Sequence, residues 1–254
     1  MLLAVLELLG IGVPRSDGGW LLHRVCARLE GPGLVVVVWA RPEERLALLD
    51  AIAGRMIPSE GRVWVDGVPS MRSTRGRIGE LVGSVELPAL LVRHRSVLWN
   101  VLAYRATRLR PVGSLLHVPR LARREAAMHA LERVGLDGRL HEPASSVDLE
   151  TAARVALARA LMPGPRHLVI REPDHALGVA DLECFLAPVA ALGRLERLTA
   201  LVSLSRPDAA NCVASRVLAP ADGLLVFDGP SAAFAQLERW PAAQGPRHLA
   251  PARA

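Results

Sequence analysis

The sequence contains no lysine, because all 31 of its basic residues are arginines. Arginine carries its permanent charge on a rigid, planar group, whereas lysine carries an ammonium on a flexible stem. The chain therefore cannot use a lysine to hold a phosphate or to form a Schiff base, and every mechanism that depends on such an ammonium is excluded.

Cysteine is also scarce. The three cysteines, Cys26, Cys184 and Cys212, are far apart in the sequence and show none of the close pair spacings of a zinc site. Neither a metal site nor a disulfide framework is expected, and free thiols in a reducing cytoplasm fit the pattern best.

Long apolar runs are missing as well. No stretch of about 18 uncharged apolar residues, the length of a membrane-spanning helix, occurs in the chain. The opening MLLAVLELLGIGV contains Glu7 and lacks the basic start of a signal peptide. We expect this segment to form an edge strand instead.

What the sequence does contain is enough apolar material for a sizeable core. Its 254 residues are 51% hydrophobic, which suits one large domain or a domain with a subdomain. The net charge of +6 comes from arginines spread through the chain, and only the span from Arg105 to Arg124 concentrates them without acids. We therefore do not expect nucleic acid to be a partner.

The first half has the pattern of strands followed by a helix. Residues 3–8 and 20–30 read as short strands, and Leu34–Trp39 is an apolar run typical of a strand covered on both faces. A helix should then start at Pro42 and end before Gly54, since proline and acids suit a first turn and glycine suits the position after the end.

The rest of the chain continues in a similar way. The alternating segment Gly61–Gly67 ends in Asp-Gly, which indicates a hairpin. A mostly helical stretch is expected from Ser96 to about Ala160. A βαβ rhythm follows, with strands at His167–Ile170 and Leu198–Leu204 and a helix over Ala180–Leu192 between them.

Several blocks, taken in order, resemble the landmarks of ABC transporter ATP-binding subunits, most closely the ATPases of phosphonate importers. The most specific are SVLWNVLAYR at Ser96–Arg105 and RVALARAL at Arg154–Leu161; the others are Leu22–Val25 with Glu30–Gly33, Leu48–Gly54, Gly61–Gly67, His129–Leu136, Arg171–Pro173, Val202–Ser205 and Val226–Phe234. The resemblance implies an α/β fold: a RecA-like P-loop NTPase core with an antiparallel β subdomain and an inserted helical subdomain at about 88–160. The domain would span 1–240, and 241–254 would be a loose tail.

The same resemblance places the phosphate-binding Walker A loop at Trp39–Ala47 (WARPEERLA), where the glycines of the family pattern GxxGxGK[ST] are absent. Those glycines let backbone N–H groups surround the phosphates. Here Pro42 removes a donor, Glu43 and Glu44 add carboxylates, and Leu46 cannot bind magnesium. Arg45 stands at the lysine position and is the candidate cofactor-binding residue.

The other family positions also depart from the pattern, with one exception. Glu172 stands at the place of the catalytic glutamate and is the candidate catalytic residue, as a relic of the family's active site. The departures are Val147–Thr151 at the signature, Leu87 at the Gln-loop, Ser205 at the switch histidine, Gly178 at the D-loop aspartate, Arg171 at the Walker B aspartate, and Arg15 or Ser16 at the adenine-stacking aromatic. Outside these positions, Asp174-His175 has no obvious nucleophile motif beside it.

The sequence therefore predicts a pseudo-ATPase: a noncatalytic homologue of the nucleotide-binding subunit that acts as a scaffold or regulator and has no cofactor. Its expected partners are a transporter membrane subunit or another ABC ATPase subunit, in a homo- or heterodimer, in the cytoplasm or peripheral at the inner face of the cell membrane. Two alternatives stay open. One is an ATP-binding subunit that uses ATP and Mg only in a heteromeric complex, and the other is an anion- or nucleic-acid-binding protein.

Overall fold

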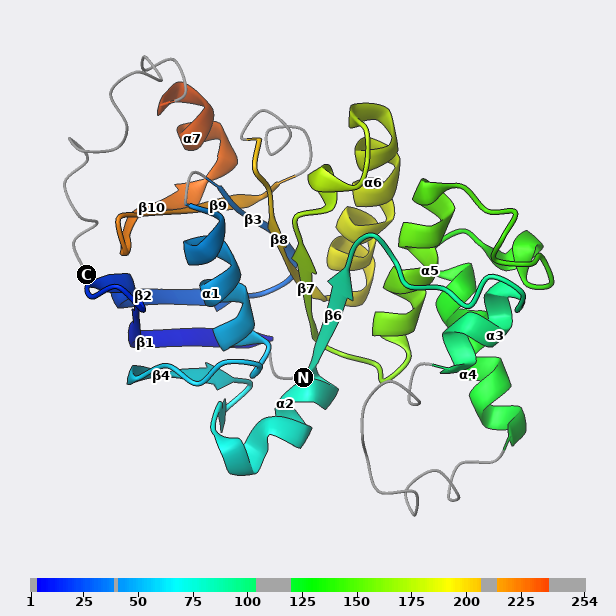
Figure 1. The fold of residues 1–254 in the computed structure, drawn as a ribbon, viewed down its shortest axis with the longest axis horizontal. Helices are drawn as coiled ribbons and strands as arrows, with labels where there is room; N and C mark the ends of the chain where they lie inside the picture. Colours follow the sequence, from blue (N-terminus) through cyan, green and yellow to red (C-terminus); the bar gives the residue numbers. More distant parts are fainter. Residues whose placement is uncertain (1–3, 39–40, 104–119, 207–213, 238–254) are drawn as a thin grey trace.

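The computed structural model describes residues 4–38, 41–103, 120–206 and 214–237 (Figure 1). Part of the stretch predicted to be helical, most of the arginine-rich span and the tail 241–254 lie outside these residues, as does Cys212. Among the residues described, no helix is both long and apolar enough to span a bilayer.

One sheet is antiparallel and has the strand order β2-β1-β4-β5. Its strands are β1 (Val5–Pro14), β2 (Trp20–Glu30), β4 (Glu60–Val65) and β5 (Val68–Pro69). The expectation of an edge strand at the start of the chain is wrong, because β1 pairs with β2 on one side and β4 on the other. A strand's own composition does not show how many neighbours it has.

The hairpin predicted at Asp-Gly is confirmed. Val65 of β4 pairs directly with Val68 of β5, and the two residues between them, Asp66 and Gly67, have φ of +48° and +77°. A two-residue turn with positive φ at both positions favours Asp-Gly, because most side chains are strained there.

The second sheet is mixed and has the order β10-β9-β3-β8-β7-β6. Its members β3 (Gly33–Val37), β6 (Val82–Glu86), β7 (His167–Arg171), β8 (Thr199–Ser203) and β9 (Arg216–Ala221) are parallel, and β10 (Leu224–Pro230) is an antiparallel edge. The parallel ladder confirms the predicted α/β core and its βαβ rhythm.

Helices cover both faces of this sheet (Figure 1). They are α1 (Pro42–Ile52), α2 (Arg75–Leu81), α3 (Val97–Leu102), α4 (Arg120–Glu132), α5 (Leu149–Leu161), α6 (Val179–Glu196) and α7 (Ser231–Leu237), with single 3₁₀ turns at Arg72–Thr74, Asp137–Arg139 and Pro173–His175. The stretch predicted to be helical, Ser96–Ala160, contains α3, α4 and α5.

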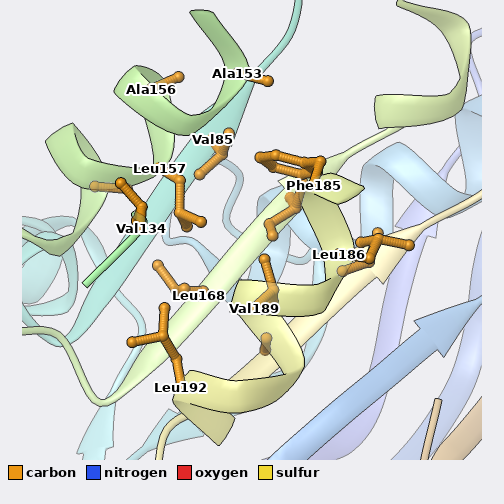
Figure 2. Close-up of a cluster of buried hydrophobic side chains, with 14 of the residues drawn as sticks. Val85, Val134, Ala153, Ala156, Leu157, Leu168, Phe185, Leu186, Val189 and Leu192 are labelled. Carbon is orange, nitrogen blue, oxygen red and sulfur yellow. The ribbon is translucent and has the colours of Figure 1, made fainter. Parts of the chain in front are cut away.

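The core divides into two apolar clusters, one on each face of the mixed sheet. Alternate residues of β3 point to opposite sides: Val35 and Val37 join the cluster around α1, and Leu34 and Val36 join the cluster under α5 and α6. Figure 2 shows part of the second cluster, where Phe185 of α6 lies among side chains of α5 and the strands below. Burial on both faces explains the unbroken apolar run of β3.

Asp66 in the hairpin turn ties the two sheets together. Its carboxylate accepts a hydrogen bond of 2.9 Å from the Val5 N–H and lies 3.2 Å from Nε2 of the fully buried His167 on β7. Burial alone would raise the pKa of Asp66, but the contacts with His167, Val5 and Arg166 outweigh it and hold this pKa below its ordinary value of 3.8.

Replacing Asp66 by asparagine should lower the free energy of unfolding at pH 7 by about 1–2 kcal/mol, the cost of a lost charged acceptor. A lowered folded-state pKa stabilises the protein above the unfolded pKa, and this contribution disappears as the pH falls below 3.8. Urea unfolding at pH 7 and at about pH 3 should therefore show a gap between wild type and variant that is smaller at the acidic pH. A gap of equal size at both pH values would contradict the charged role of Asp66.

Candidate functional site

The N-terminus of α1 carries a proline and two acidic residues. Pro42 occupies the first turn, where a missing N–H does not matter, and Glu43 and Glu44 place two acids beside the positive end of the helix dipole. The backbone N–H groups of Glu44 and Arg45 donate to the Arg41 carbonyl at 2.9 and 3.2 Å. These are ordinary first-turn helix bonds, and Arg41 makes no side-chain cap, so the two acids are the only negative charges that α1 itself places at this end of its dipole.

Glu44 is fully buried, although it is a carboxylate in the first turn of a helix. The Arg15 guanidinium lies 3.7 Å away, beyond hydrogen-bond distance. Burial raises the pKa of Glu44 above its ordinary value of 4.5, and the backbone N–H of Gly223 and the Arg41 charge oppose this only in part. The side chain therefore occupies the space next to the helix end, and burial of its charged form lowers the stability of the fold.

Replacing Glu44 by glutamine should raise the free energy of unfolding at neutral pH by on the order of 1 kcal/mol, since the amide keeps the volume without the charge. For a carboxyl with a raised folded-state pKa, the penalty is present above that pKa and absent below the unfolded value of 4.5. The difference from wild type should then vanish as the pH falls to about 4.5. The matched control is Glu43→Gln, an exposed acid one residue earlier, which should not raise stability and should lower it by at most about 0.3–1 kcal/mol through the lost dipole interaction.

Arg45 and Glu172 meet in a buried ion pair. Arg45 projects from α1, and Glu172 follows directly after β7, so the pair joins elements 127 residues apart in the sequence. Nη2 of Arg45 lies 2.6 Å from Oε1 of Glu172, and the side chains are only 5% and 13% exposed. The structure thus brings together the two candidate site residues identified from the sequence.

Two further residues complete this cluster. Ser205 follows β8, and its Oγ lies 3.4 Å from Nη2 of Arg45 and 2.5 Å from Nε2 of His175. The other ring nitrogen of His175, Nδ1, lies 3.4 Å from Oε2 of Glu172. Sequence reasoning placed Ser205 at a family position and set His175 aside, and it missed their contact. The register of β7 and β8 is the signal that could have found it.

Arg171 belongs to a separate network at the end of β7. Its guanidinium lies 3.3 Å from Asp50 of α1 and 3.2 Å from Glu86 at the end of β6, and Arg55 contacts both of these acids. Burial would raise the pKa of Glu86, but Arg55 and Arg171 hold it below its ordinary value. The two acids that approach this position are therefore already neutralised by arginines.

The N-terminus of α5, unlike that of α1, has a side-chain cap. Asp148 is the N-cap residue, and its carboxylate accepts a hydrogen bond of 2.7 Å from the Thr151 N–H. Hydrogen bonds from Thr151 hold the pKa of Asp148 below its ordinary value. Glu150 in the same turn pairs with Arg154. Sequence reasoning found these acids but not the cap that Asp148 makes.

No protein-family model matches the chain. Its fold is similar to the ADP conformation of an ATP-binding cassette of an ABC transporter, with a TM-score of 0.80 at 17% sequence identity, covering 94% of this chain and 96% of that one. The phosphonates import ATP-binding protein PhnC 1 of Natronomonas pharaonis is 32% identical over 213 residues, which cover 84% of this chain and 88% of that protein.

The chain belongs to the family of ABC transporter ATP-binding proteins. Another family member, the phosphonates import ATP-binding protein PhnC of Cupriavidus pinatubonensis, is 31% identical over 183 residues, and the match spans 72% of this chain but only 62% of that relative. A dimeric ATP-binding cassette bound to ADP and Pi has a TM-score of 0.70 at 18% identity, covering 89% of this chain and 98% of that one. The predicted family and fold class are thus confirmed.

The family resemblance predicts that Arg45 stands at the Walker A lysine position and Glu172 at the position of the catalytic glutamate. The structure places these two residues in contact with each other. Ser205, the residue predicted for the switch position, lies beside them. Arg171, the residue predicted for the Walker B aspartate position, pairs with Asp50 and Glu86.

Proposed function

We propose that this chain is a family member that neither holds nor hydrolyses ATP, and that it acts as a scaffold or regulator beside other transporter subunits. The observation that carries the proposal is the Arg45–Glu172 ion pair at 2.6 Å. A family enzyme needs the cation at the first position to bind phosphate and the carboxylate at the second to activate water. Here each group neutralises the other.

The surroundings of this pair do not fit ATP and magnesium. A phosphate cradle needs several backbone donors and room for the anion, and glycines supply both. At the end of α1, Pro42 has no N–H, and the buried Glu44 side chain fills space next to the turn. When ionised, Glu44 repels phosphate; when neutral, it still occupies the volume. Leu46 offers no oxygen to a metal ion.

The alternative of an ATP site shared with a catalytic partner subunit receives less support. In such a composite site this chain would supply the N-terminus of α5 to a phosphate of its partner's nucleotide. At that terminus the Thr151 N–H already donates a hydrogen bond to the Asp148 carboxylate. A second carboxylate, Glu150, stands in the same turn and adds repulsion.

For partners, we propose a membrane subunit of a transporter or another ATP-binding subunit, with the chain in the cytoplasm or peripheral to the membrane. The support is the family itself, whose relatives are named as import proteins and one of whose similar structures is a dimer. Those relatives are named for phosphonate import. The transport system with which this chain would assemble is therefore one of that class.

Thermal melts of the full chain with and without millimolar Mg-ATP test the proposal. A ligand that binds only the folded state raises the melting temperature by mass action. We expect no shift for this chain and a clear rise for the Natronomonas relative as a positive control. A nucleotide-dependent rise in this chain would overturn the proposal.

A further inference from the structure

We propose that Ser205, His175 and Glu172 form a serine-nucleophile triad that accepts an acyl group from small activated esters. Their juxtaposition follows from the sheet. Strands β7 and β8 are parallel neighbours in direct register, so the residues after them emerge at the same edge. Glu172 and the turn with His175 follow β7, and Ser205 follows β8.

The three side chains are arranged in the sequence serine, histidine, carboxylate that a serine nucleophile requires. Ser205 Oγ lies 2.5 Å from His175 Nε2, and the opposite nitrogen of the ring, Nδ1, lies 3.4 Å from Glu172 Oε2. The histidine can therefore take the hydroxyl proton on one side while the carboxylate orients the ring on the other. In this arrangement Ser205 and His175 are catalytic residues and Glu172 is a positioning residue.

Glu172 is itself held from several sides. Its Oε1 contacts Arg45, which leaves Oε2 for His175, and its backbone N–H donates to Ser203 Oγ at 2.9 Å. The residue has φ +42° and ψ 54°, a left-handed conformation that a non-glycine residue adopts only at a cost. Such strain persists where the surroundings fix the residue, and this is common at functional sites.

Arg45 is the cationic group next to the reacting hydroxyl, and it keeps this place while it is paired with Glu172. Its Nη2 lies 3.4 Å from Ser205 Oγ, close enough to act on an oxyanion that forms next to this oxygen. The backbone N–H groups of Ser205 and Arg206 donate instead to Asp174 at 2.8 and 3.2 Å. The arginine, and not a pair of backbone amides, would therefore be the oxyanion partner.

The cluster is also accessible. The His175 side chain is 57% exposed and Ser205 is half-buried, so a small ester can reach both. In the proposed step Ser205 Oγ bonds to the carbonyl carbon of the ester while its proton passes to His175 Nε2. The bond from that carbon to the leaving oxygen then breaks, and His175 returns the proton to the leaving alcohol. Water hydrolyses the acyl-serine by the reverse sequence, with no other reactant.

An organophosphorus fluoride such as diisopropyl fluorophosphate tests this directly, because it reacts with activated serines and not with ordinary ones. The full chain is incubated with it in the absence of nucleotide, and intact mass and peptide mapping locate the adduct. We expect one adduct, on Ser205. His175→Gln should slow labelling about 100-fold, the usual contribution of a general base. Release of p-nitrophenol from p-nitrophenyl acetate should fall in parallel.

Matched controls separate chemistry from folding. Ser73→Ala removes an exposed serine elsewhere, and His129→Gln breaks a His129–Glu132 contact that has no serine beside it. Both should label at the wild-type rate. For Glu172, Asp should restore part of the labelling rate lost in Glu172→Gln. Urea unfolding of both variants separates this effect from the loss of the Arg45 ion pair, because a positioning role predicts slower labelling even by the fully folded Glu172→Gln variant.

An adduct on any residue other than Ser205, or a His175→Gln variant that labels as fast as wild type, would overturn the triad. So would a wild type that labels no faster than Ser205→Ala. The proposal shares the Arg45–Glu172 pair with the proposed function but needs no nucleotide. ATP binding would therefore overturn only the proposed function, and a failure of labelling would overturn only the triad.

Discussion

Replacing Arg45 by methionine is expected to lower the free energy of unfolding by about 2–4 kcal/mol, because it leaves Glu172 nearly buried without its cation. The estimate is below that for a fully enclosed pair, since Glu172 retains 13% exposure and a contact with His175. Methionine keeps most of the arginine stem volume, so lost packing contributes little.

A double-mutant cycle with Glu172→Gln isolates the pair itself. The double variant should be destabilised by less than the sum of the single variants, with a coupling of about 1–3 kcal/mol in chemical denaturation. The matched control is Arg41→Met, four residues earlier, whose side chain is 57% exposed and lies 3.6 Å from Asp222. That variant should change stability by at most about 0.5 kcal/mol. Additive single effects would contradict a direct Arg45–Glu172 interaction.

Replacing Asn100 by alanine should lower the free energy of unfolding by about 2–4 kcal/mol, because its fully buried amide satisfies several backbone groups. Its Oδ1 accepts from the Val92 N–H at 2.8 Å, and its Nδ2 donates to the carbonyls of Val92 and Ser96 at 3.2 and 3.0 Å. Alanine leaves these three groups without a side-chain partner.

The control for this prediction lies in the same loop. His94→Ala removes an exposed side chain between Val92 and Ser96 and should leave the midpoint of urea unfolding unchanged. Equal effects of Asn100→Ala and His94→Ala would mean that the loop does not depend on the Asn100 amide.

Asn100 and Arg159 also give a physical reason for the two most specific blocks of the family resemblance. Nε of Arg159 on α5 donates to the Asn100 carbonyl at 2.9 Å, and Nη1 donates to the Leu90 carbonyl at 3.0 Å. Burial lowers the pKa of Arg159 below its ordinary value. The blocks SVLWNVLAYR and RVALARAL thus hold α3, α5 and the preceding loop together, a structural task that does not require nucleotide.

Local chemistry was enough to predict the elements that have their own signals. The helix from Pro42 has a proline and acids at its start, the hairpin has Asp66-Gly67 at positive φ, and β3 has an unbroken apolar run. Strand β6 was missed because it is short and contains Gly83 and Ser84. The glycine is there for close packing, since a Cβ at Gly83 would lie 2.6 Å from the Ala160 carbonyl oxygen.

The candidate site could be predicted only in part. The family resemblance singled out Arg45 and Glu172 as candidate site residues, but their contact depends on how α1 packs against the sheet that contains β7. The contact between His175 and Ser205 depends on the order of β7 and β8, which no local pattern in either strand specifies. Likewise, the burial of Glu44 cannot be predicted from its sequence neighbours, because Glu43 before it is exposed and Arg45 after it is buried.

The most direct test of the central claim is a calorimetric titration of Mg-ATP into the full chain, with the Natronomonas relative titrated in parallel. We predict no saturable heat for this chain at millimolar nucleotide, both for wild type and for Arg45→Lys, because Pro42 and Glu44 are still present in the variant. Saturable binding with a dissociation constant below about 0.1 mM, roughly 5.5 kcal/mol of binding free energy, would contradict it.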